Sequence, residues 1–253
     1  MVSRIPQAPE EPHRTYVLAH AHPDDETLAT GAVLLGLRGR GDETYVLTAT
    51  RGEKGEVVPG ALDRYAAGTP LVEVREAELG SAVAVLGVHG HAYLGRPPAR
   101  AEGLAPRRYE DSGMRWVTPT VAGPGEDAGP ESLTSADVAE VAGDIAAYAA
   151  AVGATDLVSY ADDGGYGHPD HVRMHEATRA AAVQLGLPFW IIVSEQAEGD
   201  DWFDAADRQA LDAAHHAYAT QFTLEGDTVT HVGGQSTPIV LAAGLRRQGG
   251  PRR

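Results

Sequence analysis

The sequence predicts an α/β protein: a Rossmann-like, mostly parallel sheet with helices on both faces, in a single domain. Short apolar runs that suit buried strands alternate with longer segments whose apolar residues recur at helical spacing, which is typical of βαβ units. The chain has 253 residues, of which 43% are hydrophobic, and this is enough for one sizeable core. No G-x-G-x-x-G follows the first expected strand, which argues against a dinucleotide cofactor.

The expected elements follow one another along the chain. The first strand, 15–19, is short, apolar and partly β-branched. The first helix, 27–40, ends before Gly41, a residue that suits a C-cap. The other strands are expected at 44–50, 91–94, 156–160 and 189–194, with a short one near 228–232. The other helices are expected at 70–86, 134–152, 170–185 and 204–219.

The remaining segments set the expected domain limits. Residues 1–12 are polar and Pro-rich and predict a disordered lead-in to a domain at 13–244. The Arg-rich segment 245–253 predicts a flexible tail. The segment 95–131 is rich in Pro, Gly and charge, and a loop of this length is usually a lid, a binding loop or disorder.

Composition excludes several classes of function. The net charge of −16 argues against a nucleic acid or an anionic membrane as partner, because both need a basic face. The chain has no cysteine, so any metal must sit on His, Asp or Glu. No apolar run reaches the length of a membrane span, and no signal-type segment opens the chain. We therefore expect a cytoplasmic protein with a small-molecule substrate, and the sequence does not determine the oligomeric state.

A first polar cluster, His22-Pro23-Asp24-Asp25-Glu26, directly follows the first expected strand. Pro23 stiffens the turn. Because Asp24 and Asp25 are adjacent, their side chains cannot point the same way, so one can ligate a metal with His22 while the other faces its bound water. The alternative is an aspartate that only caps the following helix, and the second cluster makes this alternative weaker.

The second cluster, His168-Pro169-Asp170-His171, follows the fourth expected strand and a glycine-rich turn, 163–167. Pro169 suits the first turn of a helix, so His168 and His171 fall at a helix N-terminus. The positive end of the helix dipole disfavours imidazolium and favours the neutral imidazole that a metal needs. A metal explains at least one of these histidines, and surface histidines in a turn are the alternative.

Both clusters are expected at the carboxyl ends of parallel strands, where open α/β sheets bind their ligands. Together they supply three ligands and a spare carboxylate, and three protein ligands with one open position make the pattern of a catalytic zinc site. Such an ion lowers the pKa of its water to about 7, a carboxylate takes the proton, and an imidazole stabilises the oxyanion. This chemistry cleaves amides or esters.

Two other histidines compete for the role of ligand. His20 shares a strand face with His22, and it packs against the site instead if the strand ends there. His175 lies one turn beyond His171 and imitates the His-x-x-x-His of zincins, but Val172 stands where that motif has its catalytic Glu.

The two clusters, read as Ala21-His22-Pro23-Asp24-Asp25-Glu26 and Gly164-Gly165-Tyr166-Gly167-His168-Pro169-Asp170-His171, resemble the PIG-L/LmbE-like family of N-acetylglucosaminyl deacetylases. Within that family the chain is most similar to the actinobacterial mycothiol-pathway deacetylase and amidase. Shorter matches lie within 15–238, and they include 75–79, 111–114 and 218–221.

The resemblance implies a role for each site residue. His22, Asp25 and His171 would hold Zn²⁺, or alternatively Fe²⁺. Asp24 would be the general base, and His168, tuned by Asp170, would stabilise the oxyanion or protonate the leaving amine. Tyr166 would reach the oxyanion from its loop. Arg75 and Asp111 would contact the sugar or its aglycone.

The leading hypothesis is therefore a zinc-dependent hydrolase that removes the N-acetyl group of an N-acetylglucosamine derivative, such as N-acetylglucosaminyl-inositol. The alternatives are an amidase of mycothiol S-conjugates, a non-haem iron oxygenase built on the same ligand types, and a binding protein that holds its metal structurally.

Overall fold

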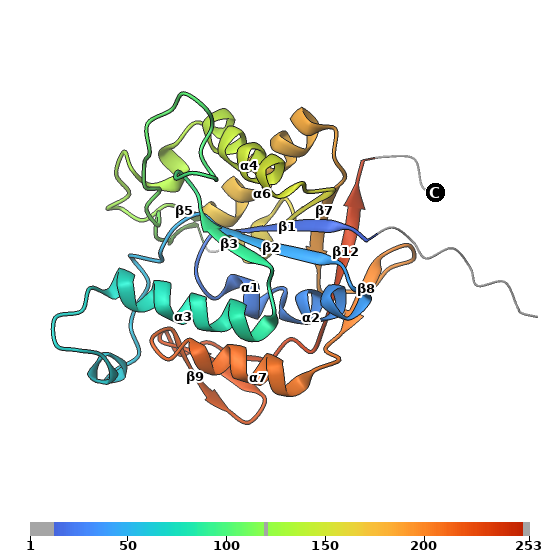
Figure 1. The fold of residues 1–253 in the computed structure, drawn as a ribbon. Helices are drawn as coiled ribbons and strands as arrows, with labels where there is room; N and C mark the ends of the chain where they lie inside the picture. Colours follow the sequence, from blue (N-terminus) through green and yellow to red (C-terminus); the bar gives the residue numbers. More distant parts are fainter. Residues whose placement is uncertain (1–12, 119–120, 250–253) are drawn as a thin grey trace, which may run out of the picture.

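The computed structural model describes residues 13–118 and 121–249, and a seven-stranded sheet forms its centre (Figure 1). The strands lie in the order β3-β2-β1-β6-β7-β12-β8. The first five are parallel, and β12 runs antiparallel to both of its neighbours. Their bounds are β1 Thr15–His20, β2 Glu43–Thr48, β3 Gly90–Tyr93, β6 Asp156–Ser159, β7 Phe189–Val193, β8 Asp201–Asp204 and β12 Ala242–Gln248. The predicted α/β class with a mostly parallel sheet is confirmed.

Helices cover both faces of this sheet, as Figure 1 shows. One face carries α4 and α6, and the other carries α2, α3 and α7. The helices are α1 Asp25–Leu28, α2 Gly31–Arg40, α3 Leu71–Leu86, α4 Val138–Val152, α5 Gly164–Gly167, α6 Pro169–Leu185 and α7 Arg208–Ala217, with 3-10 turns η1 Ala61–Arg64 and η2 Leu133–Ser135. In the part of the chain that the structure describes, no helix combines the length and apolarity needed to cross a bilayer.

Strand β1 explains why its sequence reads as a continuous apolar run. Val17 and Ala19 pack into the core beneath α4 and α6, while Tyr16 and Leu18 pack into the core on the opposite face. Because side chains of a strand alternate between faces, a parallel strand covered on both sides has no solvent-facing position.

Three predicted helices begin or divide differently in the structure. The segment predicted as one helix at 27–40 forms α1 and α2, although α2 ends before Gly41, which adopts the expected left-handed C-cap with φ 82°. Helix α4 begins only at Val138, because Asp137 rather than Thr134 caps it by accepting from the Ala139 N–H at 2.8 Å. The start predicted at 204 for the last helix is also wrong, because 201–204 belong to β8 and Asp207 caps α7.

The prediction of a flexible tail is wrong for residues 245–248. They continue β12, which lies between β7 and β8 (Figure 1). Leu245 is fully buried, and Arg246 pairs with Asp200 at 2.8 Å. The segment lacks β-branched residues, so sheet pairing rather than local preference makes it a strand. The lead-in predicted at 1–12 and the last residues, 250–253, lie outside the described residues.

Two smaller sheets flank the carboxyl edge of the main sheet. Strands β9 Phe222–Glu225, β10 Thr228–His231 and β11 Ser236–Pro238 form an antiparallel sheet near the predicted strand at 228–232. The long segment 95–131 contains a hairpin of β4 Arg115–Thr118 and β5 Val121–Gly123.

Candidate metal centre

The two polar clusters meet at the point where the strand order reverses, between β1 and β6. The chain leaves β1 towards β2 and β3 on one side, and towards β6 and β7 on the other. The first cluster follows β1, and the second begins α6 directly after the turn that follows β6. The ring centroids of His22 and His171 are therefore only 5.4 Å apart. Ligands of open α/β sheets bind at this type of crevice.

His22, Asp25 and His171 converge on one another. Oδ1 of Asp25 lies 3.3 Å from Nε2 of His171, and Oδ2 of the same carboxylate lies 3.5 Å from Nδ1 of His22. All three side chains are buried or nearly so. The carboxylate of Asp25 thus lies between the two histidines, with one oxygen towards each ring, while the converging ligand atoms around His22 and His171 also include His168.

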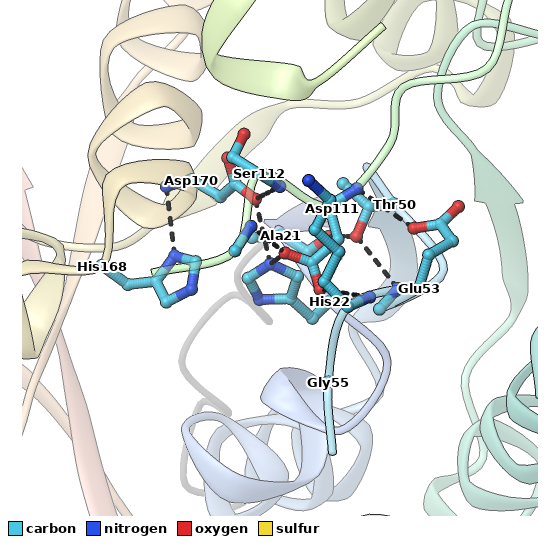
Figure 2. Close-up of polar contacts among 12 residues, drawn as sticks. Ala21, His22, Thr50, Glu53, Gly55, Asp111, Ser112, His168 and Asp170 are labelled. Atoms are coloured by element: carbon cyan, nitrogen blue, oxygen red, sulfur yellow. Dashed lines mark hydrogen bonds and ion pairs between the residues drawn. The ribbon is translucent and has the colours of Figure 1, made fainter. Parts of the chain in front are cut away.

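Hydrogen bonds set the tautomer of both imidazoles. Nδ1 of His171 donates to the Gly164 carbonyl at 3.1 Å, so its Nε2 carries a free lone pair. Nε2 of His22 donates to the Asp170 carboxylate at 3.2 Å (Figure 2). Its Nδ1 is therefore directed at Asp25. Metal-bound histidines are usually held in this way, through the ring nitrogen that does not bind the ion.

A cation fits the space between these groups. Nε2 of His171 is buried and has no hydrogen-bond partner among the described residues, although a carboxylate oxygen lies 3.3 Å away. Two lone pairs that face each other in a buried site repel unless a positive charge lies between them, either a metal ion or, without one, a proton on the imidazole. Two imidazoles and one carboxylate are a ligand set that zinc and ferrous iron both accept.

The charge of the surroundings also favours a cation. Besides Asp25 and Asp170, the carboxylate of Asp111 approaches Nε2 of His22 to 3.6 Å (Figure 2). Burial opposes a charge on His22, but these carboxylates outweigh burial and hold its pKa well above the ordinary value. Burial likewise opposes the charge of Asp25, yet His171 and His22 keep the pKa of that carboxyl well below its usual range.

His168 is held as a hydrogen-bond donor. It caps α6, and its Nδ1 accepts the Asp170 backbone N–H at 3.2 Å, so the neutral ring carries its proton on Nε2 (Figure 2). Burial, followed by the nearby His22 and His171, lowers the pKa of His168 to about 3. A ligand atom of His168 does lie within 4.8 Å of ligand atoms of His22 and His171, but its Nδ1 is occupied and its Nε2 bears a proton.

Asp170 contacts a different histidine from the one expected. Its carboxylate accepts from His22 and from the Ser112 N–H at 2.9 Å, while only its backbone N–H reaches His168 (Figure 2). Asp170 thereby orients the predicted metal ligand His22 as well as the ring of His168.

Asp24 has an unusual backbone conformation. With φ 108° it is the one non-glycine residue with positive φ in the described ranges, 13–118 and 121–249. Its N–H donates to Oε2 of Glu26 at 3.2 Å, and its side chain lines the cleft above the cluster. Burial and the adjacent carboxylates of Asp25 and Glu26 raise the pKa of Asp24 well above its ordinary value. Strained residues of this kind concentrate at functional sites.

Tyr166 extends over the two histidines of the second cluster. It lies in a turn whose neighbours Gly165 and Gly167 have φ of 81° and 84°, a conformation that favours glycine. Its ring makes edge contacts with His168 and His171, at centroid distances of 5.9 and 5.1 Å. With 59% of its surface exposed, the side chain is free to face a bound molecule.

Arg75 and Asp111, the two predicted substrate-binding residues, both line the same cleft. The guanidinium of Arg75 is buried and donates to the carbonyls of Gly55 and Glu56 at 3.1 Å. Asp111 accepts from the Gly113 N–H at 2.7 Å and lies beside His22.

The competing histidines lie outside the cluster. Nε2 of His20 is 3.1 Å from the Thr30 hydroxyl, and Nδ1 of His175 donates to the Tyr160 carbonyl at 2.8 Å. Neither ring belongs to a group of converging ligand atoms in the described part of the chain.

Sequence reasoning assigned no role to Tyr160, Glu26 and Tyr218, which support the cluster. Tyr160 donates to Asp25 at 2.7 Å and stacks on His171. Tyr218 donates to Glu26 at 2.6 Å, and both are buried. In the sequence Tyr160 looks like an ordinary core residue at the end of a strand, so no motif marks it as part of the site. Glu26 belongs to the first cluster, and Tyr218 is the first residue of the short match at 218–221, so the sequence does contain a signal for both residues.

The cleft above the cluster has a volume of about 780 Å³. Its walls come from the loop after β2, the segment after Asp111, and the three-stranded sheet. This volume is typical of a site for a small organic ligand.

The sequence of this chain is similar to those of known proteins. The family model PIG-L, described as GlcNAc-PI de-N-acetylase, matches residues 17–182. A 1D-myo-inositol 2-acetamido-2-deoxy-alpha-D-glucopyranoside deacetylase of Kineococcus radiotolerans is 45% identical over 170 residues, which are 67% of this chain and 45% of that protein. A protein of the same name from Saccharopolyspora erythraea is 42% identical over 171 residues, 67% of this chain and 54% of its own length. The chain thus spans about half the length of these curated relatives.

Solved structures resemble the fold at low sequence identity. A deacetylase in complex with teicoplanin aligns with TM-score 0.57 and 20% identity, over 93% of this chain and 100% of that one. The 4-carboxy-2-hydroxymuconate hydratase GalB of Pseudomonas putida aligns with TM-score 0.56 and 16% identity, over 94% and 97% of the two chains. One fold thus serves both a deacetylase and a hydratase, so the family assignment depends on sequence. By the match over 17–182, this chain belongs to the PIG-L family.

Proposed function

We propose that this chain is a metal-dependent N-deacetylase that hydrolyses the acetamide of an N-acetylglucosamine derivative. One observation carries the proposal: each of two imidazoles, His22 and His171, is held through one ring nitrogen and presents the other to the carboxylate of Asp25. The trio lines an open cleft rather than a closed site, which favours a catalytic over a structural metal.

His22, Asp25 and His171 would hold the ion, with zinc as the proposed metal and ferrous iron as the alternative. When bound, such an ion supplies Lewis acidity and makes a water molecule acidic near neutral pH. Asp170 and Gly164 orient the two imidazoles for this task.

Asp24 is the proposed general base. Its carboxylate lines the cleft beside the proposed ligand Asp25, and its raised pKa makes it a stronger base than an ordinary aspartate. Its position next to Asp25 in the chain brings a base within reach of the site while its strained backbone separates the two side chains.

His168 is the proposed donor to the oxyanion. It stays neutral at physiological pH, and its Nε2 proton is available because Nδ1 already accepts a backbone N–H. A donor that is already oriented stabilises charge that develops in the transition state without further reorganisation. The alternative role, protonation of the leaving amine, would need the imidazolium form of His168, because a neutral ring that gives up its Nε2 proton becomes imidazolate. Tyr166 is proposed as a second donor from the loop.

Arg75 and Asp111 are proposed to bind sugar hydroxyls or the aglycone, because both line the cleft and carry buried charge. N-acetylglucosaminyl-inositol is one candidate within this substrate class, since the relatives named above are deacetylases of that compound. The cytoplasmic location and the exclusion of nucleic acid and membranes as partners stay predictions that rest on composition and charge.

The test is a screen of N-acetylglucosaminyl-inositol, N-acetylglucosamine and a mycothiol S-conjugate for released primary amine, with elemental analysis of the protein. We expect acetate release from an N-acetylglucosamine derivative, loss of activity with chelator, and recovery with added Zn²⁺. Asp24→Ala should retain the metal and lose nearly all activity. Full activity of metal-free protein would refute the proposal, and turnover of the S-conjugate alone would favour the amidase.

A further inference from the structure

Two segments of the chain contribute apolar residues to the cleft. The hairpin side presents Met114 and Trp116, which are 37% and 58% exposed. The small sheet and the chain after it contribute Val240, which is 39% exposed, and the buried Val229 and Ile239. We call these five residues the outer cleft. Trp116 is thus a large aromatic side chain that lines the same cleft as the metal centre and keeps more than half of its surface exposed.

Strand geometry directs Trp116 into the cleft. Side chains alternate along β4, so Trp116 leaves the face opposite to that of its neighbours Arg115 and Val117, and both Trp116 and the preceding Met114 line the cleft. Arg115 accordingly donates to the Pro124 carbonyl, and Val117 covers Gly123, where an added Cβ would lie 2.8 Å from it.

The hairpin lies against the turn that carries Tyr166. Trp116 pairs with Ala122 across the hairpin, and a Cβ built on Gly167 would contact the Ala122 methyl group at 3.8 Å. Gly167 follows Tyr166, whose ring contacts both His168 and His171. The hairpin that carries Trp116 therefore lies next to the turn that carries Tyr166.

We infer that the outer cleft binds an aromatic or apolar aglycone of the substrate, with Trp116 as the surface on which it stacks. This inference rests on the proposed deacetylase function. The cleft, about 780 Å³, has room for more than an aminosugar ring.

The experiment compares methyl and 4-nitrophenyl N-acetylglucosaminides, as both anomers, with zinc-loaded protein. The readout is the ratio of kcat/KM for the aryl and the methyl substrate. We expect the wild type to favour the aryl substrate roughly 3- to 10-fold, the size of one aromatic stacking contact. Trp116→Ala should reduce the ratio to about 1, and Trp116→Phe should restore most of it. Val117→Ala, on the opposite face of β4, should leave the ratio unchanged.

Calorimetric binding of the corresponding amines, methyl and 4-nitrophenyl glucosaminide, separates this inference from the proposed function. Trp116-dependent binding of the aryl amine without any hydrolysis would support the aglycone site and refute the deacetylase. Hydrolysis with an aryl-to-methyl ratio that Trp116→Ala does not change would refute the aglycone site alone. A wild-type dimer that Trp116→Ala dissociates, with unchanged affinity for both amines, would assign the outer cleft to a second copy of the chain.

Discussion

The ring of Tyr160 stacks on the imidazole of His171, with 4.0 Å between centroids and 8° between the ring planes. The hydroxyl of Tyr160 donates to Asp25 at 2.7 Å and accepts the Ala21 N–H at 2.8 Å. A single side chain that no motif contains thus positions two of the three proposed metal ligands.

Tyr160→Phe is expected to weaken metal binding while the stack is retained. The variant loses the hydrogen bond that orients Asp25, and supporting contacts of this kind are worth roughly 10- to 100-fold in metal affinity. Titration of the metal-free protein with zinc against a competing chelator measures the effect. Tyr148→Phe, at a buried tyrosine of α4 outside the site, is the control. Unchanged affinity in Tyr160→Phe would show that Asp25 needs no such support.

Glu26→Gln is expected to lower kcat about 10-fold with little change in KM or metal content. The carboxylate of Glu26 accepts both the Asp24 N–H and the Tyr218 hydroxyl, and so holds the strained backbone of Asp24. Steady-state kinetics with elemental analysis provides the measurement, and Tyr218→Phe should reproduce the defect in weaker form. An effect on KM alone would contradict this role.

His168→Ala and His171→Ala are both expected to lose activity, the first through slower turnover and the second through loss of the metal. His168→Ala should keep its zinc and lose roughly 10²- to 10³-fold in kcat, the loss typical of one oxyanion donor. His171→Ala should lose zinc itself, because its Nε2 faces Asp25 as a ligand. Metal content and kcat of the two purified variants decide the matter. Loss of zinc from His168→Ala with zinc retained in His171→Ala would reverse the two assignments.

His91 is expected to make stability fall with acid. Burial, and then the charge of Arg51, lowers the pKa of His91 to about 4, below the unfolded value of about 6.5. Between these values the unfolded chain binds a proton that the native protein does not, so the free energy of unfolding decreases as pH falls through this window. This group contributes at most about 1.4 kcal/mol per pH unit.

His91→Gln should therefore lose less stability than the wild type between pH 6.5 and pH 4. Glutamine can still bond the Thr48 hydroxyl, which lies 3.1 Å from Nε2 of His91, but it does not titrate. Urea unfolding at both pH values measures the difference. An equal decrease in both proteins would show that His91 is not the group responsible.

Local sequence patterns predicted much of the fold, because a strand that is buried on both faces of the sheet consists of a continuous apolar run. The sequence 15–19 identified β1, and Gly41 marked the end of α2. The prediction of a flexible tail fails for residues 245–248, because the sequence Leu245-Arg246-Arg247-Gln248 has little strand preference. Only pairing with β7 and β8 makes it a strand. Pairing over long sequence distance is not encoded in a short window.

The sequence alone determined which residue types gather at the site, because the two clusters carry their ligands within a few positions of a strand end. Only the tertiary structure decided how each is used. The Gly164 carbonyl and the Asp170 carboxylate select the free nitrogen of His171 and of His22, and the Asp170 N–H makes His168 a donor. A tautomer depends on which atom faces a ring nitrogen, and that atom comes from a distant part of the chain or from a turn whose shape the sequence does not show.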